Sequence, residues 1–253
     1  MFDCHQQVEE EVTDTMIKKI QHCFDVLVYL IHRTCWNLAS HWGRVHGLVL
    51  MYHHITDEEV NIMPSCKHSP TVFRGTIERL LAEGYVFVSL DRMMEILEKK
   101  EEVKFAVITF DDIMDDVYTN ALPILRQLRL PYALFVAPGL IGTDVYITRE
   151  HLLEMDQDPL CTVGAHSITH SRLRKAHDPV QEIAASKRQL ETLLGHKVDM
   201  MAYPFGWDCD VSRENMRQAR EAGYRCAFGT IQSPVSETSS KNLFYLPRVV
   251  LMS

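Results

Sequence analysis

The sequence predicts an α/β fold whose parallel sheet is rolled into a barrel. Short apolar segments alternate with segments of helical periodicity from about residue 46 onward, as expected for a sheet built from repeated βα units. The segment 105–110 has five apolar residues, one Thr and no charge, which predicts a strand buried on both faces. Two carboxylates follow this strand, at the end where parallel α/β folds keep their active sites.

Eight apolar runs are predicted as strands. They cover residues 46–55, 85–89, 105–112, 132–136, 162–166, 198–203, 225–229 and 244–250. Eight strands that alternate with helices fit a parallel barrel better than a sandwich.

The segments between these strands carry apolar residues at helical spacing. The predicted helices cover residues 70–83, 90–98, 117–128, 148–155, 177–194 and 212–222. Pro123 lies inside one of them, so the sequence does not fix where that helix begins.

We divide the chain into an N-terminal helical extension, residues 1–45, and a barrel domain, residues 46–253. Apolar residues recur at helical spacing between residues 12 and 31, which suits a helix packed on the barrel. Trp36 and Trp42 add apolar surface, so peripheral membrane contact or dimerisation through this helix stays open.

Composition excludes several classes of partner. The chain has 253 residues, 46% of them hydrophobic, enough to bury the core of one α/β domain. A net charge of −8 gives no electrostatic case for binding nucleic acid or an anionic membrane. The apolar run 24–31 is interrupted by Asp25 and is followed by His32 and Arg33, so we expect no transmembrane segment.

The seven cysteines are an odd number and form no Cys-x-x-Cys pair, a pattern typical of reduced intracellular thiols. The first residues are acidic and polar, which is unlike the basic start of a secretory signal. We therefore expect a cytoplasmic protein.

Asp111 and Asp112 come directly after the buried strand. Adjacent carboxylates are hard to ionise together unless a cation or hydrogen bonds offset their charge. They could equally cap the next helix, since Asp is a favoured residue at the N-cap position of helices.

A second apolar strand runs into His166-Ser-Ile-Thr-His170. Two imidazoles four residues apart on one helical turn can bind one divalent metal ion, and a carboxylate completes a three-ligand set with open positions. We therefore expect Asp112, His166 and His170 to form a metal site. Zinc is the first expectation for this ligand set, and cobalt, nickel or iron would also fit.

Here the chain resembles the polysaccharide deacetylases, the fourth family of carbohydrate esterases. Thr109-Phe-Asp-Asp112 and His166-Ser-x-x-His170 are similar to the signature pair of that family, and Ala202-Tyr-Pro-Phe-Gly206 resembles its Arg-x-Pro-Tyr-Gly segment. The resemblance covers about residues 48–250. It implies a distorted (β/α) barrel and metal-dependent removal of acetyl groups from N-acetylated sugars. It also implies that Asp111 is the general base and that Asp112, His166 and His170 bind the metal.

Three positions depart from the family pattern. Ile113 stands where Gly often follows Asp-Asp, Ala202 replaces the Arg that orients the base, and Arg248 stands where a His usually acts as general acid. The chain resembles a permuted subgroup that acts on poly-N-acetylglucosamine. In that arrangement His53, at the end of the first strand, would supply the acid, with His54 as the second choice, and Arg248 would replace the missing Arg.

Tyr203, Pro204, Phe205 and Trp207 are candidates for a substrate-binding wall that stacks on a sugar ring, or for core residues. The expected substrate is an acetylated poly-, oligo- or glycoconjugate saccharide. Two other functions stay open: a degenerate homologue that binds carbohydrate without turnover, and a metal-dependent amidohydrolase of a small non-sugar substrate.

Overall fold

The computed structural model describes residues 46–250 of the chain. The predicted N-terminal extension, with its possible membrane or dimer contacts, lies outside these residues. The elements are β1 (His46–Tyr52), β2 (His54–Ile55), η1 (Pro64–Cys66), β3 (Lys67–His68), α2 (Pro70–Ala82), β4 (Val86–Phe87), α3 (Leu90–Lys99), β5 (Lys104–Asp111), η2 (Val117–Ala121), α4 (Leu122–Leu128), β6 (Tyr132–Val136), α5 (Arg149–Asp156), β7 (Cys161–Ala165), α6 (Pro179–Leu194), β8 (Met200–Ala202), α7 (Arg213–Glu221), β9 (Cys226–Phe228) and η3 (Glu237–Lys241).

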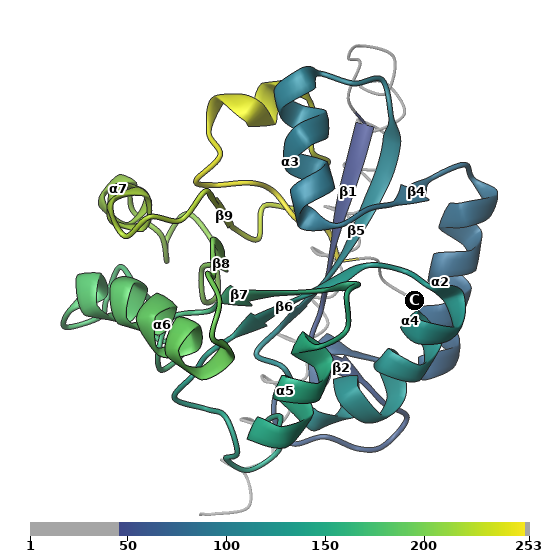
Figure 1. Ribbon diagram of the computed structural model, residues 1–253, viewed down its shortest axis with the longest axis horizontal. Helices are drawn as coiled ribbons and strands as arrows, with labels where there is room; N and C mark the ends of the chain where they lie inside the picture. The colour runs from purple at the N-terminus through teal and green to yellow at the C-terminus, as the bar shows by residue number, and fades with distance from the viewer. Residues whose placement is uncertain (1–45, 251–253) are drawn as a thin grey trace, which may run out of the picture. The chain divides into compact units, whose positions relative to one another are not determined.

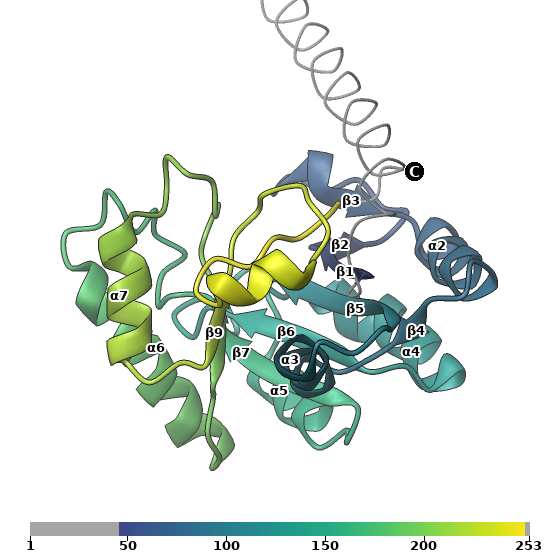
Figure 2. The same ribbon diagram turned by 90° about the horizontal axis from the view of Figure 1, so that it is seen from above.

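The predicted parallel α/β sheet is confirmed. Seven strands pair in parallel in the order β1–β5–β6–β7–β8–β9, and β4 pairs with the first part of β5. The sheet is curved, and helices surround it (Figures 1 and 2). Strand β5 is buried along seven of its eight residues, as its uncharged sequence predicts. Among residues 46–250, no helix is long and apolar enough to cross a membrane.

The predicted last strand, 244–250, is wrong as a continuous strand. Only two isolated parallel bridges form there, Phe228 with Leu246 and Leu50 with Val249. Val249 donates its N–H to the Val49 carbonyl and accepts from Met51. The C-terminal segment therefore joins β9 to β1 and closes the barrel. Pro247 lies between the two bridges, and a residue without an N–H cannot extend a ladder.

Helix α3 packs into the core together with strand residues. Leu90, Met93, Ile96 and Leu97 belong to the same buried cluster as Phe105 and Val107 of β5, Phe135 of β6 and Phe228 of β9. Because side chains alternate along a strand, the register that places Phe105 and Val107 in this cluster also turns Asp111 toward the barrel interior.

The predicted helix 117–128 is divided in two. Residues 117–121 form a π-helical turn, η2, and α4 then begins at Leu122 with Pro123 in its first turn. The first turn is the part of a helix that tolerates Pro, because its N–H groups have no partner within the helix.

Candidate active site

The predicted site residues meet at the carboxyl ends of the strands. Asp111 is the last residue of β5, His53 follows β1 and His166 follows β7. Parallel strands of a barrel open their carboxyl ends onto one face. Side chains far apart in the sequence are thereby brought together.

Asp112, His166 and His170 offer ligand atoms that all lie within 4.8 Å of one another. Nε2 of His170 lies 3.2 Å from Oδ1 of Asp112, and Nε2 of His166 lies 3.8 Å from the same oxygen. Two imidazole nitrogens and one carboxylate oxygen form a ligand set that suits zinc and other divalent transition metals.

The surroundings of Asp112 fit a cation. Both of its carboxylate oxygens are buried and have no hydrogen-bond partner among residues 46–250, an arrangement that is costly unless a positive charge completes it. Burial, with a further contribution from the Asp111 charge, raises the pKa of Asp112 to about 8. Burial also lowers the pKa of His166 to about 3, so its ring is neutral and free to act as a ligand at neutral pH.

The backbone that carries these ligands is not helical. His166 to His170 form a turn, and Ser167 and His170 have φ of 57°, so the expected helical turn for His-x-x-x-His is wrong. The turn nevertheless does what a helical turn would do, since it brings a nitrogen of each ring into the same cluster of ligand atoms.

The Asp-Asp segment is also strained. Asp112 and Ile113 have φ of 61° and 49°, a region that is unfavourable for a β-branched residue. Ile113 therefore occupies a conformation that Gly would adopt freely. Strain of this kind concentrates at functional sites.

Arg248 reaches Asp111 from the C-terminal segment. Its two terminal nitrogens each donate to one Asp111 oxygen at 2.6 Å, and both side chains are buried. Nε of Arg248 donates to the Gly229 carbonyl, which fixes the plane of the guanidinium. Burial alone would raise the pKa of Asp111. The Arg248 charge and hydrogen bonds, together with the neighbouring His166 and His53, outweigh that effect and hold the pKa at about 2.

His53 lies at the edge of the site. Its Nε2 is 4.0 Å from Oδ2 of Asp112, and 14% of its side chain is exposed. Burial lowers the pKa of His53 to about 4, with Asp111 opposing the shift and Arg248 and His170 adding to it. The ring is therefore neutral at pH 7.

His54, the second choice for the acid, is occupied elsewhere. Its Nδ1 contacts Asp116 at 2.6 Å and its Nε2 donates to the Ile62 carbonyl at 2.9 Å. Asp116 also accepts the Ile55 N–H. His54 thus ties β2 to the segment before η2, and neither ring nitrogen is left for a substrate.

The four candidates for a stacking wall differ in their burial. Tyr203 is fully buried and donates its hydroxyl to the Phe244 carbonyl, and Pro204 is buried as well. These two are core residues, which is the alternative that the sequence left open. Phe205 and Trp207 are exposed, and the Phe205 ring centroid lies 4.8 Å from that of His170.

The sequence did not predict one group that contributes to the site, the backbone carbonyl of Ala202. The Ala202 carbonyl accepts a hydrogen bond of 2.8 Å from Nδ1 of His166, which leaves Nε2 of that ring turned toward Asp112. Such a bond fixes the tautomer and orientation of a metal ligand. A backbone carbonyl has no sequence signal, so only the position of β8 beside β7 reveals it.

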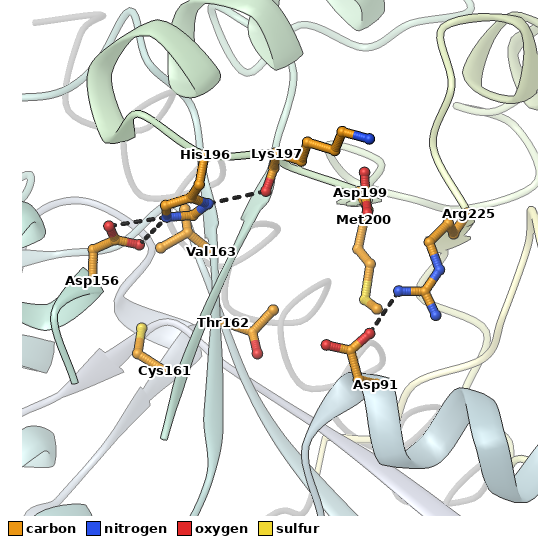
Figure 3. Close-up of a pocket in the computed structure, with 10 residues that line it drawn as sticks. All are labelled: Asp91, Asp156, Cys161, Thr162, Val163, His196, Lys197, Asp199, Met200 and Arg225. Atoms are coloured by element: carbon orange, nitrogen blue, oxygen red, sulfur yellow. Dashed lines mark hydrogen bonds and ion pairs between the residues drawn. The ribbon is translucent and has the colours of Figure 1, made fainter. Parts of the chain in front are cut away.

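A second polar pocket lies at the opposite ends of the strands (Figure 3). It is lined by residues at the start of β7 and β8 and before β9, including Cys161, Met200 and Arg225. Two ion pairs partner its charges, Arg225 with Asp91 and His196 with Asp156 (Figure 3). These ion pairs satisfy four of the charged side chains in the lining, which also includes Lys197 and Asp199.

Comparison with known proteins agrees with this geometry. The polysaccharide deacetylase family model matches residues 98–227. The poly-β-1,6-N-acetyl-D-glucosamine N-deacetylase of Staphylococcus aureus is 25% identical over 201 residues, which cover 72% of this chain and 67% of the relative.

Solved structures show the same fold. The Streptococcus pyogenes deacetylase PplD, solved in complex with acetate, matches with a TM-score of 0.72 and 26% identity over 82% of this chain and 93% of its own. The Bacillus cereus polysaccharide deacetylase BC0361 matches with a TM-score of 0.71 and 24% identity, over 81% of this chain but only 64% of its own. Because the family model covers half of the sequence, and the fold agrees, this chain belongs to the polysaccharide deacetylase family.

Proposed function

We propose that this protein is a metal-dependent N-deacetylase that removes acetyl groups from a saccharide built of N-acetylated glucosamine units. The observation that carries the proposal is the convergence of Asp112, His166 and His170 within 4.8 Å, beside the buried Asp111–Arg248 pair. A module that only binds carbohydrate has no chemical need for three metal ligands and a held carboxylate.

The substrate class is supported by two observations. The relative from Staphylococcus aureus is named for poly-β-1,6-N-acetyl-D-glucosamine. The exposed rings of Phe205 and Trp207 lie on the loop after β8, and the Phe205 ring lies beside His170. Flat apolar rings beside a polar centre suit a pyranose, whose faces are apolar and whose edges are polar.

The residues of this chain divide the proton transfers between them. A divalent ion held by Asp112, His166 and His170 would polarise the acetyl carbonyl and acidify a water molecule. Arg248 keeps Asp111 ionised throughout the physiological range, so Asp111 is always ready to accept a proton from attacking water. The bidentate contact also holds both carboxylate oxygens in place, so no reorganisation is needed during the reaction.

The leaving amine needs a proton when the carbon–nitrogen bond breaks. His53 is the group placed to give it, since its ring is partly exposed and 4.0 Å from Asp112. With a pKa near 4, the ring is neutral at rest. It must therefore receive a proton within the catalytic cycle before it can donate one.

The test is to incubate the protein with N-acetylated β-1,6-glucosamine oligomers and to measure released acetate and free amine, with and without a chelator. A chromogenic acetyl ester and a small acetylated amine serve as comparison substrates. Metal-dependent release from the oligomers supports the proposal. Binding of oligomers without release would indicate a degenerate homologue, and turnover of the small amide alone would indicate a non-sugar amidohydrolase.

A further inference from the structure

The two histidine ligands are held in different ways. His166 donates its Nδ1–H to the Ala202 carbonyl. For His170, no such acceptor exists among the residues that the structure describes, and its ring lies instead against Phe205, at 4.8 Å between centroids and an angle of 45°. A metal ligand without a hydrogen bond to its second nitrogen needs another group to orient its ring.

Phe205 is itself fixed from several sides. Its φ is 61°, in the left-handed region, and its carbonyl accepts the Thr230 hydroxyl at 2.8 Å. The guanidinium carbon of Arg172 lies 3.7 Å from the centre of the Phe205 ring. A planar guanidinium this close to an aromatic face attracts it electrostatically and restricts its tilt.

Arg172 is anchored in turn by Asp210. The two side chains form an ion pair, and Asp210 is only 1% exposed. The other carboxylate oxygen of Asp210 is buried without a hydrogen-bond partner in the described part of the chain. The carboxylate therefore depends on Arg172, and a continuous set of contacts runs from Asp210 through Arg172 and Phe205 to the ligand His170.

We propose that Arg172 and Asp210 are positioning residues that act through Phe205 to hold the His170 ring in the orientation required for binding a divalent metal ion. This inference rests on the metal site proposed above. The direction of the change in metal affinity distinguishes this role from simple electrostatics. Removing the positive charge of Arg172 from the neighbourhood of a metal site should, by charge alone, strengthen metal binding. Loss of orientation should weaken it.

The experiment measures zinc affinity of the metal-free protein by competition with a chromophoric chelator. Arg172→Ala should weaken zinc binding roughly 10-fold, the lower end of the effect of losing a residue that orients a ligand. Arg172→Lys keeps the charge and the partner Asp210 but loses the flat stacking group, so it should also weaken binding by several-fold. This second variant preserves the ion pair and so guards against a failure to fold.

Arg174→Ala is the matched control. Arg174 lies in the same loop, but its guanidinium donates to the Asp208 carbonyl at 3.0 Å, and no contact with Phe205 is recorded for it in residues 46–250. Its removal changes the net charge equally and should leave zinc affinity unchanged or slightly higher. The absorption spectrum of the cobalt-substituted protein should change in the Arg172 variants and stay unchanged in the control, since it reports the geometry of the ligands.

Three results would overturn the inference. If both Arg172 variants bind zinc as tightly as the wild type while KM for the acetylated oligomer rises, Arg172 contacts substrate and does not position His170. If Arg174→Ala weakens zinc binding as much as Arg172→Ala, the effect belongs to the loop as a whole. A wild-type protein that binds no divalent metal would instead refute the proposed metal site, and with it this inference.

Discussion

Replacing Arg248 tests the electrostatic design of the site most directly. Arg248→Met keeps much of the side-chain volume but leaves the Asp111 carboxylate without its cation in a fully buried position. Removing one partner of a buried ion pair typically destabilises a protein by about 3–5 kcal/mol. We expect a loss of about 3 kcal/mol at pH 7 in the metal-free protein.

The pKa of Asp111 determines how the loss of stability in the variant depends on pH. In the wild type, the pKa of Asp111 is lowered from 3.8 to about 2, so its contribution is present above about pH 4 and is lost as the pH falls toward 2. The shift corresponds to about 2 kcal/mol. In the variant, burial without Arg248 raises that pKa above its ordinary value. The folded variant therefore loses stability as the pH rises above about 4, and the difference between the two proteins is larger at pH 7 than at pH 4.5.

Urea unfolding with a chelator present measures this difference at both pH values. The chelator is needed because a bound cation would also offset the Asp111 charge. A double variant, Arg248→Met with Asp111→Leu, removes both charges and should recover most of the lost stability. A loss below about 1 kcal/mol, or an equal loss at both pH values, would refute the argument that the orphaned carboxylate is the cause.

The remaining predictions concern the chemistry and the compartment. Asp111→Asn should keep metal content and lower turnover by roughly 10²–10⁴-fold, whereas Asp112→Asn should lose the metal; equal metal loss in both variants would contradict this division. Because the pKa of Asp112 is raised to about 8, metal binding at pH 7 should release about one proton; calorimetry in buffers of different ionisation enthalpy checks it, and a release near zero would count against Asp112 as a ligand. His53→Ala should retain metal and lose activity on an N-acetyl amide far more than on an activated acetyl ester; similar losses on both would indicate a structural role. Denatured protein prepared without reductant should titrate with seven free thiols, in keeping with the proposed reducing cytoplasmic location; stable disulfides would reverse that proposal.

Local sequence was sufficient for the central strand and for the residues of the candidate metal site. An uncharged run followed by two carboxylates predicts the buried strand β5 and its active-site end, since burial and side-chain type are both local properties. The motif around His166 and His170, taken with Asp112, predicts three potential ligands, and the structure brings their ligand atoms within 4.8 Å of one another. The motif did not predict the backbone that carries them, since turns with positive φ have no periodic signal.

The family resemblance predicted that Arg248 takes the place of the Arg that orients Asp111, but only the tertiary structure decided how groups meet across the barrel. Arg248 lies 137 residues from Asp111 in the sequence, and the two meet because the C-terminal segment closes the sheet between β9 and β1. The same packing buries Tyr203, engages both ring nitrogens of His54 and aligns Arg172 with Phe205. The strand-to-strand register sets these contacts, and it is the sum of many distant pairings that no short stretch of sequence contains.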